Sequence, residues 1–300
     1  VVGAGGRAAP VLQYLAGAGV GRVRLVDGDR VALSNLHRQT LFRENDIGAP
    51  KPQAAARHMA GLNPDCIIEP VTTPLDPANV AALCEGVDLV LDCADSFAAS
   101  YVLSDHCLAR NLPLISASVI QAEGYCGGFC GGAPSLRAVF PDLPERLGSC
   151  AADGVLGPVV GILGAIQAQM ALAVLAGLKP SPLGRLVQVD ALTFRVSGFR
   201  FDSAPEPAAG HRFVAAAQIA PGDLVVDLRG AHEPGPQLPG ATRIAPAEIT
   251  ACPPPPEPGR RLVLACRSGL RSWQAADRLR PHWGDNIALV ALGDIEGDTS

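Results

Sequence analysis

The sequence lacks an excess of basic residues, an internal repeat and a signal-peptide pattern. Its 24 Lys and Arg are outnumbered by 29 Asp and Glu, and the net charge of −5 at pH 7 argues against nucleic acid or an anionic membrane as the main partner. No period recurs along the chain, so a repeat architecture is not indicated. Because residue 1 is Val and the first strand is cut short, we expect a further N-terminal segment in the natural protein.

The nine cysteines do not form the even set of a disulfide scaffold. Several lie inside apolar strand or helix candidates, namely Cys66, Cys84, Cys93 and Cys107. This distribution favours a reducing compartment, and we expect the protein to be cytoplasmic.

One long uncharged run, residues 155–178, has the length of a membrane span. Pro158, Gln167, Gln169 and several glycines interrupt its apolar character. We therefore interpret the run as a helix buried in protein, and we expect no membrane partner.

What the chain does contain is organised around residues 3–39, GAGGRAAPVLQYLAGAGVGRVRLVDGDRVALSNLHRQ. Gly3, Gly5 and Gly6 predict a tight turn after a buried strand; a helix and a second strand follow, and that strand ends in Asp27. Glycines let the backbone approach phosphate, and a helix N-terminus offers free N–H groups to an anion. This is the layout of a nucleotide-binding βαβ unit in which Asp27 accepts hydrogen bonds from ribose hydroxyls. A turn that binds nothing, or an NAD enzyme, would explain these residues equally well.

The polar residues that come next separate these alternatives. The segment from Ser34 to Gln39 and, further on, Lys51 bring an amide, a guanidinium and an ammonium group close to the phosphate turn. A dinucleotide enzyme needs no such cations, because its pyrophosphate is already cradled. A site that expels pyrophosphate does need them, since charge builds on the leaving group.

The following 160 or so residues alternate between strand and helix candidates, which predicts a doubly wound α/β domain with a mostly parallel sheet. The candidates are strands over residues 66–71, 87–93 and 114–119 and helices over residues 52–62, 77–84 and 100–110. Ligands bind such sheets beyond the carboxyl ends of the strands, where Gly3, Asp27 and Asp95 all fall. Residues 123–158 are glycine-rich and are expected to be irregular, and strands over residues 185–189 and 194–201 are expected to close the domain.

The stretches GAGG, LVDGDRVALSNLHRQTLF, GAPKPQAA and LVLDCADS resemble the MoeB, ThiF and HesA adenylyltransferases, which are related to the ubiquitin-activating enzymes. The resemblance covers about residues 1–200. It implies ATP-dependent adenylation of a carboxylate, with Lys51 and Arg38 neutralising phosphates, Asn35 orienting the triphosphate and Asp95 holding Mg²⁺. The implied nucleotide-binding residues are Gly3, Gly5, Gly6, Asp27, Ser34, Asn35, Arg38, Gln39, Lys51, Asp95 and Ser96. Taken alone, Asp95 could equally be the N-cap of the next helix.

The sequence departs from this family's pattern in two places. Ser135 and Ala138 stand where the first of two zinc-binding Cys-x-x-Cys pairs is usual, and the second pair is also absent, so no structural zinc is expected. Family members also supply an N-terminal arginine across a homodimer, which this chain does not carry. Cys150 resembles a family cysteine on a loop over the active site that in some relatives bonds to the carrier; a bystander thiol is the equal alternative.

A second unit is expected over residues 211–300, after a linker over residues 203–210. Cys266 ends a buried strand and precedes a helix, so backbone N–H groups and the helix dipole converge on its thiol, and Arg267 and Arg271 add positive charge. A phosphatase loop would need arginine at position 272, which is Ser. The loop instead resembles that of rhodanese, the sulfurtransferase whose cysteine carries a persulfide. The given sequence ends before the final helix that the resemblance to rhodanese leads us to expect.

Together the two resemblances imply an adenylyltransferase domain over residues 1–202 fused to a rhodanese-like domain, an architecture similar to MoeZ. The expected function is adenylation of the Gly-Gly C-terminus of a ubiquitin-like sulfur carrier similar to MoaD or ThiS, with sulfur delivered from a persulfide on Cys266 and with Arg271, Arg38, Lys51 and Cys150 assisting. The expected cofactors are ATP and Mg²⁺, and the expected assembly is a homodimer. The alternative is a nucleotide-binding activator or scaffold whose rhodanese unit only docks.

Overall fold

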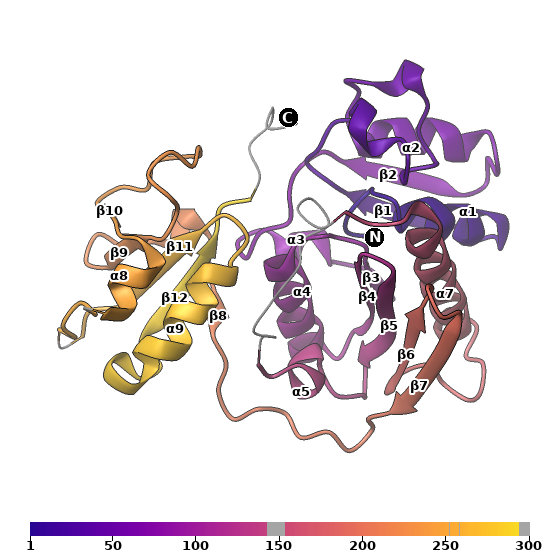
Figure 1. Cartoon of the computed structure of the whole chain (residues 1–300). Coiled ribbons are helices and arrows are strands. Elements are labelled where there is room, and N and C mark those ends of the chain that lie inside the picture. The colour runs from indigo at the N-terminus through magenta and orange to yellow at the C-terminus, as the bar shows by residue number, and fades with distance from the viewer. Residues whose placement is uncertain (143–153, 252, 258, 294–300) are drawn as a thin grey trace.

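The computed structural model describes residues 1–142, 154–251, 253–257 and 259–293. The chain folds into two α/β units, each around its own sheet, and an extended segment after the first unit's last strand runs across to the second (Figure 1).

The first unit contains strands that are parallel at one side of its sheet and antiparallel at the other. Val2 forms parallel bridges to both Val26 and Asp92 and so joins β1 and β2 to the strands β3–β7. β1 pairs in parallel with β2 and β3 with β4, whereas β4 to β7 pair antiparallel in chain order. The strands are β1 Arg22–Val26, β2 Ile67–Val71, β3 Val90–Asp92, β4 Pro113–Ile120, β5 Glu123–Cys130, β6 Arg185–Asp190 and β7 Arg195–Arg200. The predicted Rossmann-like α/β fold is confirmed, and the closing pair of strands is β6 and β7.

Helices cover both faces of this sheet (Figure 1). α7 packs against α1, β4 and β5, while α4 contacts β3, β4 and β5 from the other side. The helices are α1 Ala8–Gly17, α2 Lys51–Ala60, α3 Val80–Leu83, α4 Phe97–Arg110, α5 Leu136–Val139 and α7 Gly157–Leu175, with 3₁₀ turns at Leu33–Asn35 and Glu44–Asp46.

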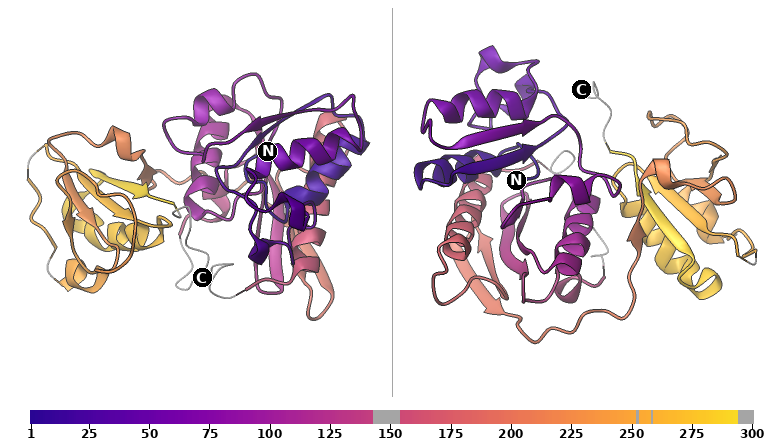
Figure 2. Two further views of the ribbon diagram at one scale, coloured as in Figure 1. Left: turned by 90° about the horizontal axis from the view of Figure 1, so that it is seen from above. Right: turned by 180° about the vertical axis from the view of Figure 1, so that it is seen from behind.

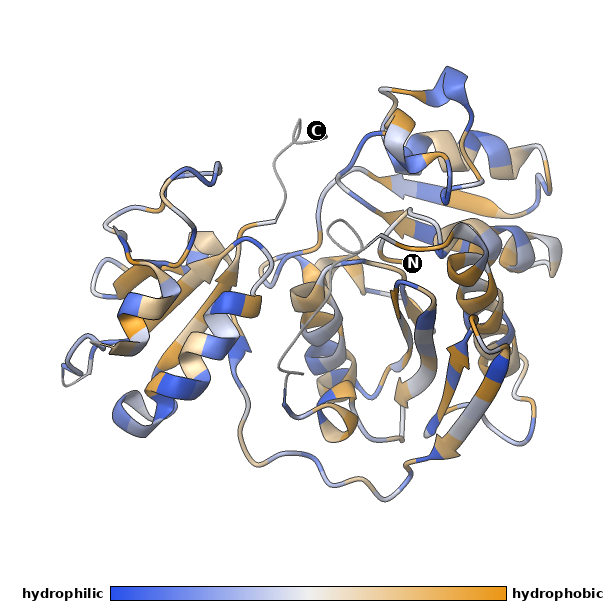
Figure 3. Cartoon of the chain, in the orientation of Figure 1, coloured by the Kyte–Doolittle hydropathy of each residue, from blue (hydrophilic) through white to orange (hydrophobic). Residues whose placement is uncertain are grey.

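α7 is, within the described residues, the one helix long and apolar enough to cross a membrane, and Figure 3 shows its hydrophobic colouring. Yet 44% of its apolar window is buried inside the protein. Its fully buried Gln167 donates a hydrogen bond of 2.8 Å from Nε2 to the carbonyl of Asp92. These contacts are those of a core helix that packs on the sheet, as the sequence predicts.

The prediction of an irregular segment over residues 123–158 is wrong, because the first part of it is the eight-residue strand β5. The three glycines of this strand are the reason that the sequence pattern predicted an irregular segment. A Cβ at Gly124 would lie 2.4 Å from Leu163, and one at Gly128 would lie 2.6 Å from the carbonyl of Pro182. These glycines allow α7 and the chain before β6 to approach the strand closely, so they mark packing sites instead of loops.

The second unit is a five-stranded sheet with the order β10-β9-β11-β12-β8, in which every pair is parallel. α9 packs on β11 and β12, and α8 packs on α9 (Figure 2). The elements are β8 Arg212–Phe213, β9 Leu224–Asp227, β10 Thr242–Arg243, α8 Pro246–Ala251, β11 Leu262–Cys266, α9 Leu270–Trp283 and β12 Ile287–Ala291, with a 3₁₀ turn at Ala216–Gln218.

The two units share an aromatic contact centred on Trp273 of α9. Its ring lies 5.4 Å from that of Phe97 and 5.0 Å from that of Tyr101, both on α4. The guanidinium of Arg137 sits 4.8 Å above the Tyr101 ring and 5.3 Å above that of Trp273. Buried residues of both units therefore belong to one hydrophobic cluster.

The segment between the units is tied to the first unit. The Ser135 backbone N–H and hydroxyl each donate a hydrogen bond of 2.6 Å to the carboxylate of Glu206, and Arg137 donates to the carbonyl of His211. His211 in turn pairs with Asp277 of α9 at 2.6 Å. The expected linker is thus held at Glu206 and at His211, the residue that directly follows it.

Candidate functional site

The glycine turn lies against the carboxyl end of β3. Gly3 has φ +91°, and a Cβ there would lie 2.6 Å from the backbone of Cys93. A Cβ at Gly6 would lie 2.8 Å from the carbonyl of Arg38, whereas Gly5 has no contact closer than 3.7 Å, to Gln39. Two of the predicted glycines are therefore required by packing, and Gly5 faces the most open space of the three.

Asp27 closes the turn from the end of β1. Its carboxylate accepts hydrogen bonds from the backbone N–H of Ala4 at 2.6 Å and of Asp29 at 2.7 Å. Burial raises the pKa of Asp27, an effect that the nearby Lys51 ammonium partly offsets. The aspartate thus holds the glycine turn directly.

The predicted cations lie around the same turn but are already engaged. Lys51, the first residue of α2, is 5% exposed, and its Nζ is 2.7 Å from the carboxylate of Asp29. Arg38 donates from Nη1 to His37 at 2.8 Å and to the carbonyl of Ser34 at 3.3 Å. Ser34 itself is exposed.

Asn35 and Gln39 belong to the same loop. The Asn35 carbonyl accepts hydrogen bonds from the backbone N–H groups of Arg38 and Gln39, and its side chain is half-buried. Gln39 is 5% exposed. This loop therefore brings an amide, a guanidinium and a buried glutamine to the glycine turn.

Asp95 follows β3 and is exposed, and within the described residues no hydrogen bond or ion pair engages its carboxylate. The N-cap of α4 is Ser96, whose Oγ accepts the Ala99 N–H at 3.4 Å. Ser96 is therefore the N-cap of α4, and the alternative interpretation of Asp95 as that N-cap is wrong. The carboxylate is left available to a cation.

Sequence reasoning missed Arg7 and Asp92. Arg7 precedes α1 and is 5% exposed, and its Nη2 donates to the carbonyl of Ala94 at 2.5 Å. Asp92 is fully buried and accepts hydrogen bonds from the Ser116 hydroxyl at 2.7 Å and the Ala94 N–H at 3.1 Å. Burial raises the pKa of Asp92, and the Arg7 guanidinium opposes this. One sequence signal existed, since Arg7 is the sole charged side chain in residues 1–21.

Within the described residues, three buried side-chain atoms have no hydrogen-bond partner: Arg7 Nη1, Gln39 Oε1 and Ser272 Oγ. Leaving such a group unsatisfied costs about 1–3 kcal/mol. Two of the three lie at the glycine turn, and the third lies at the cysteine loop of the second unit. Groups that lack a partner inside the fold are suited to a ligand.

Cys266 ends β11 and is fully buried. Its Sγ accepts a hydrogen bond of 3.4 Å from the backbone N–H of Ser272 in the first turn of α9. Gly269, at φ +88°, is the N-cap of α9, and a Cβ there would lie 3.3 Å from the Cβ of Ala98 in α4. The cysteine loop therefore lies against the first turn of the helix that follows Asp95.

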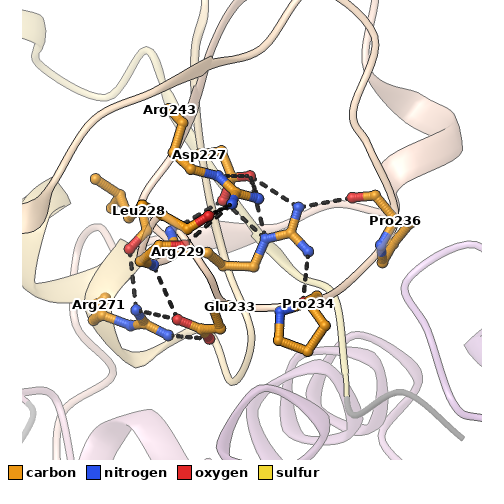
Figure 4. A network of polar contacts seen from close by, with 10 residues as sticks. Asp227, Leu228, Arg229, Glu233, Pro234, Pro236, Arg243 and Arg271 are labelled. Carbon is orange, nitrogen blue, oxygen red and sulfur yellow. Dashed lines mark hydrogen bonds and ion pairs between the residues drawn. The ribbon is translucent and has the colours of Figure 1, made fainter.

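Arg271, in the first turn of α9, belongs to a network of arginine–carboxylate pairs (Figure 4). Arg271 donates to the carboxylate of Glu233 at 2.5 and 2.8 Å and to the carbonyl of Leu228 at 3.1 Å. Asp227 is held by Arg229 at 2.8 Å and Arg243 at 3.0 Å. The Arg271 guanidinium, which the sequence analysis assigns to the cysteine loop, is thus held by Glu233.

Two further predictions concern cysteine and zinc. Cys150 lies outside the described residues. Ser135 and Ala138, at the positions of the usual first zinc-binding pair, are joined by a hydrogen bond of 3.3 Å from the Ala138 N–H to the Ser135 hydroxyl. Ser135 also binds Glu206, so hydrogen bonds to the interunit segment occupy this position.

Residues 1–210 match the model of the ThiF family. The chain belongs to the ThiF family. It is 40% identical over 204 residues to the SAMP-activating enzyme E1 of Haloferax volcanii, a match that covers 67% of this chain and 76% of that protein. It is 40% identical over 195 residues to the molybdopterin-synthase adenylyltransferase of Escherichia coli, covering 64% of this chain and 78% of that protein.

A further ThiF-family relative is the adenylyltransferase and sulfurtransferase MOCS3 of Bos taurus, with 45% identity over 195 residues. That match covers 64% of this chain but only 43% of the relative, so the chain matches less than half of that longer protein. Among solved structures, MccB of E. coli with AMPCPP and MccA has a TM-score of 0.62 at 19% identity, covering 70% of this chain and 65% of that chain. This likeness confirms the fold.

Within the ThiF-family unit, the carboxylate of Asp95 is suited to Mg²⁺. Within the described residues no group of three His, Cys, Asp or Glu side chains forms a metal site. Mg²⁺ is commonly held by one or two carboxylates together with substrate phosphates and water. The residues present therefore fit a cation that arrives with a nucleotide.

Proposed function

We propose that the chain is an adenylyltransferase that activates the C-terminal carboxylate of a ubiquitin-like sulfur carrier. The observation that carries the proposal is the packing of the glycine turn, in which Gly3 lies against the segment before Asp95 and Gly6 against the backbone of Arg38. Lys51 lies near Asp27 at the same turn. The names of the ThiF-family relatives support the proposal, because they include an E1 and two adenylyltransferases.

In the proposed reaction a carboxylate oxygen attacks the α-phosphorus of ATP, the bond to the bridging oxygen breaks, and pyrophosphate leaves. The N-terminus of α1 and the glycine turn bind phosphate oxygens. Lys51 and Arg38 offset the charge that builds on the leaving group. Lys51 reaches this role by exchanging its contact with the mostly exposed Asp29 for a phosphate.

Asp27 binds the ribose hydroxyls with the lone pairs that its two backbone contacts leave free. Asp95 holds Mg²⁺, which when bound neutralises phosphate charge. Asn35 and Gln39 orient the triphosphate from the loop after β1. Each of these residues lies within the part of the chain that matches the family.

We further propose that the second unit transfers sulfur. The terminal sulfur of a Cys266 persulfide attacks the acyl carbon of the adenylate, AMP leaves, and an acyl disulfide forms. A second thiol, for which Cys150 is the sequence candidate, then attacks the Cys266 sulfur of this acyl disulfide, so that a disulfide forms between the two cysteines and the thiocarboxylate leaves. The support is the resemblance of the cysteine loop to rhodanese, together with the Ser272 N–H that donates to the thiol sulfur.

A second candidate function is a nucleotide-binding scaffold whose C-terminal unit only docks. The full burial of Cys266 favours this alternative, because a persulfide must be reachable to react. In the sulfur-transfer proposal the cysteine loop changes conformation to expose the thiol.

The test is ATP–pyrophosphate exchange by the full-length protein with Mg²⁺, against a panel of carriers that end in Gly-Gly. Exchange that depends on one carrier is the expected result. ATP binding without exchange for any carrier would favour the scaffold. A matched carrier whose last glycine is deleted should give no exchange, which links the signal to the C-terminal carboxylate.

A further inference from the structure

The side chain of Arg7 is out of place in its surroundings. It is the one charged residue in an otherwise uncharged glycine turn and helix, yet only 5% of its surface is exposed. Its Nη2 is bonded to the carbonyl of Ala94, and its Nη1 has no partner. A guanidinium has five donor hydrogens in a fixed plane. The hydrogen bond from Nη2 to the protein therefore leaves the hydrogens of Nη1 available to another acceptor.

The position of the guanidinium is fixed by its backbone and by its contact. The backbone of Arg7 closes the glycine turn and starts α1, and its Nη2 reaches the residue that precedes Asp95. Gly3 packs against the same segment, because a Cβ there would lie 2.7 Å from the Ala94 nitrogen. The guanidinium therefore lies against the segment that joins β3 to Asp95, while the backbone of the same residue begins α1.

We infer that Arg7 is a further phosphate-binding residue, whose Nη1 donates to an α-phosphate oxygen of the nucleotide. This rests on the proposed function in that the ligand is a nucleotide. Two independent features point to an anion here: the N-terminus of the ten-residue helix α1 and the unpartnered buried donor beside it. The fully buried carboxylate of Asp92 supplies an opposite charge near the guanidinium.

If Arg7 had only a structural role, its guanidinium would balance the charge of Asp92 and would not bind phosphate. The experiment must separate charge balance from phosphate binding. Arg7→Met by itself leaves the buried Asp92 without its counter-charge and can unfold the site. We therefore compare Asp92→Asn with the double variant Arg7→Met/Asp92→Asn, both of which lack a buried carboxylate at position 92. Thermal unfolding checks that the two variants are equally folded.

The measurement is calorimetric binding of AMP and of adenosine, which needs no turnover and no carrier. We expect the affinity ratio of AMP over adenosine to fall about tenfold in the double variant relative to Asp92→Asn, with adenosine affinity unchanged. Arg7→Lys should retain part of the preference, because the charge is kept and the planar donor pair is lost.

An AMP-to-adenosine ratio within twofold of Asp92→Asn, in a folded double variant, would overturn the role of Arg7 and leave the proposed function standing. If the wild-type protein binds neither AMP nor ATP, the nucleotide site itself is wrong and the inference falls with it. The two failures are thus distinguishable from the wild-type titration alone.

Discussion

The two candidate sites of this chain treat buried charge in opposite ways. At the glycine turn, burial raises the pKa of both Asp27 and Asp92, and Arg7 Nη1 and Gln39 Oε1 have no partner. Around the cysteine loop, arginines lower the pKa of Glu233 and keep its carboxylate charged. The first site has two unpartnered groups, one of which is a charged donor, whereas the charged groups drawn around the second site are paired and its one unpartnered buried atom is the neutral hydroxyl of Ser272.

This difference matches the chemistry proposed for each site. A nucleotide brings several negative charges, so a charged donor that is unsatisfied beforehand, Arg7 Nη1, gains from its arrival. The attacking sulfur of a persulfide brings a single negative charge, so fewer free donors are needed in its loop. The predictions that follow test this contrast, from the largest expected effect to the smallest.

The largest effect is expected from Cys266→Ala. Removing the sulfur that carries the persulfide should abolish thiocarboxylate formation on the carrier while pyrophosphate exchange stays at the wild-type rate. Both are measured on the same preparation, so exchange is the internal control. Sulfur transfer that survives the substitution would place the chemistry on another thiol.

The next effect is expected from Asp95→Asn, which removes the free carboxylate at the end of β3. Mg²⁺-dependent exchange should fall by about 10²- to 10³-fold, as when one preorganised electrostatic contact is lost from an active site. Asp88→Asn is the matched control, because Asp88 is exposed and precedes the same strand at the opposite edge of the sheet. Equal losses in the two variants would contradict a role in metal binding.

Trp273→Ala should destabilise the second unit by about 3–5 kcal/mol and loosen its contact with α4. Trp283→Ala is the control, since Trp283 is also buried in α9 but donates its indole N–H to Pro254 within the same unit. Hydrogen exchange at Phe97 and Tyr101 should accelerate only in Trp273→Ala. Unchanged protection there would mean that the units are held together by other contacts.

The smallest effect is a difference in acid response between the two sites. The Arg271 pair lowers the pKa of Glu233, and the Arg261 pair lowers that of Asp223. Their stabilisation is present above the unfolded pKa values near 4 and is lost as the pH falls through the lowered folded values. Asp92 has the opposite sign, because a raised folded pKa makes its contribution decline as the pH rises above about 4.

Urea unfolding of each unit between pH 3 and 6 measures this contrast. We expect the second unit to lose stability on acidification and Asp92→Asn to flatten the pH dependence of the first unit. If the substitution leaves the pH dependence of the first unit unchanged, Asp92 does not titrate in this range.

Much of the fold and part of the site could be predicted from the sequence, and the residues show why. The turn at Gly3 and Asp27 has local chemistry that any βαβ unit requires, and the apolar run that became α7 is visible by composition. β5 was missed because Gly124 and Gly128 are residue types typical of loops. In the structure they lack a side chain where α7 and Pro182 pack closely against the strand. That packing depends on contacts between distant segments.

The hydrogen-bond and ion-pair partners of the site residues could not be predicted from the sequence either. Nothing local pairs Lys51 with Asp29 or Arg271 with Glu233, since each pair spans a chain crossing between elements. Arg7 was overlooked because the glycine-turn pattern assigns no role to the residue at that position, whereas its contact with the carbonyl of Ala94 exists only in the folded chain. Motifs identify residue types at a site, whereas the tertiary fold decides which of them are already occupied.

The placement of Trp273 gives the protein a built-in optical reporter. The chain has two tryptophans, Trp273 and Trp283, and both lie on α9, so the first unit contributes none. The Trp273 indole touches the first turns of α4, the helix that begins directly after Asp95 and Ser96. Intrinsic emission excited at the indole band should therefore register events at the nucleotide edge without any label, and a spectrum that shifts on adding Mg²⁺ and ATP would read out the coupling of the two halves.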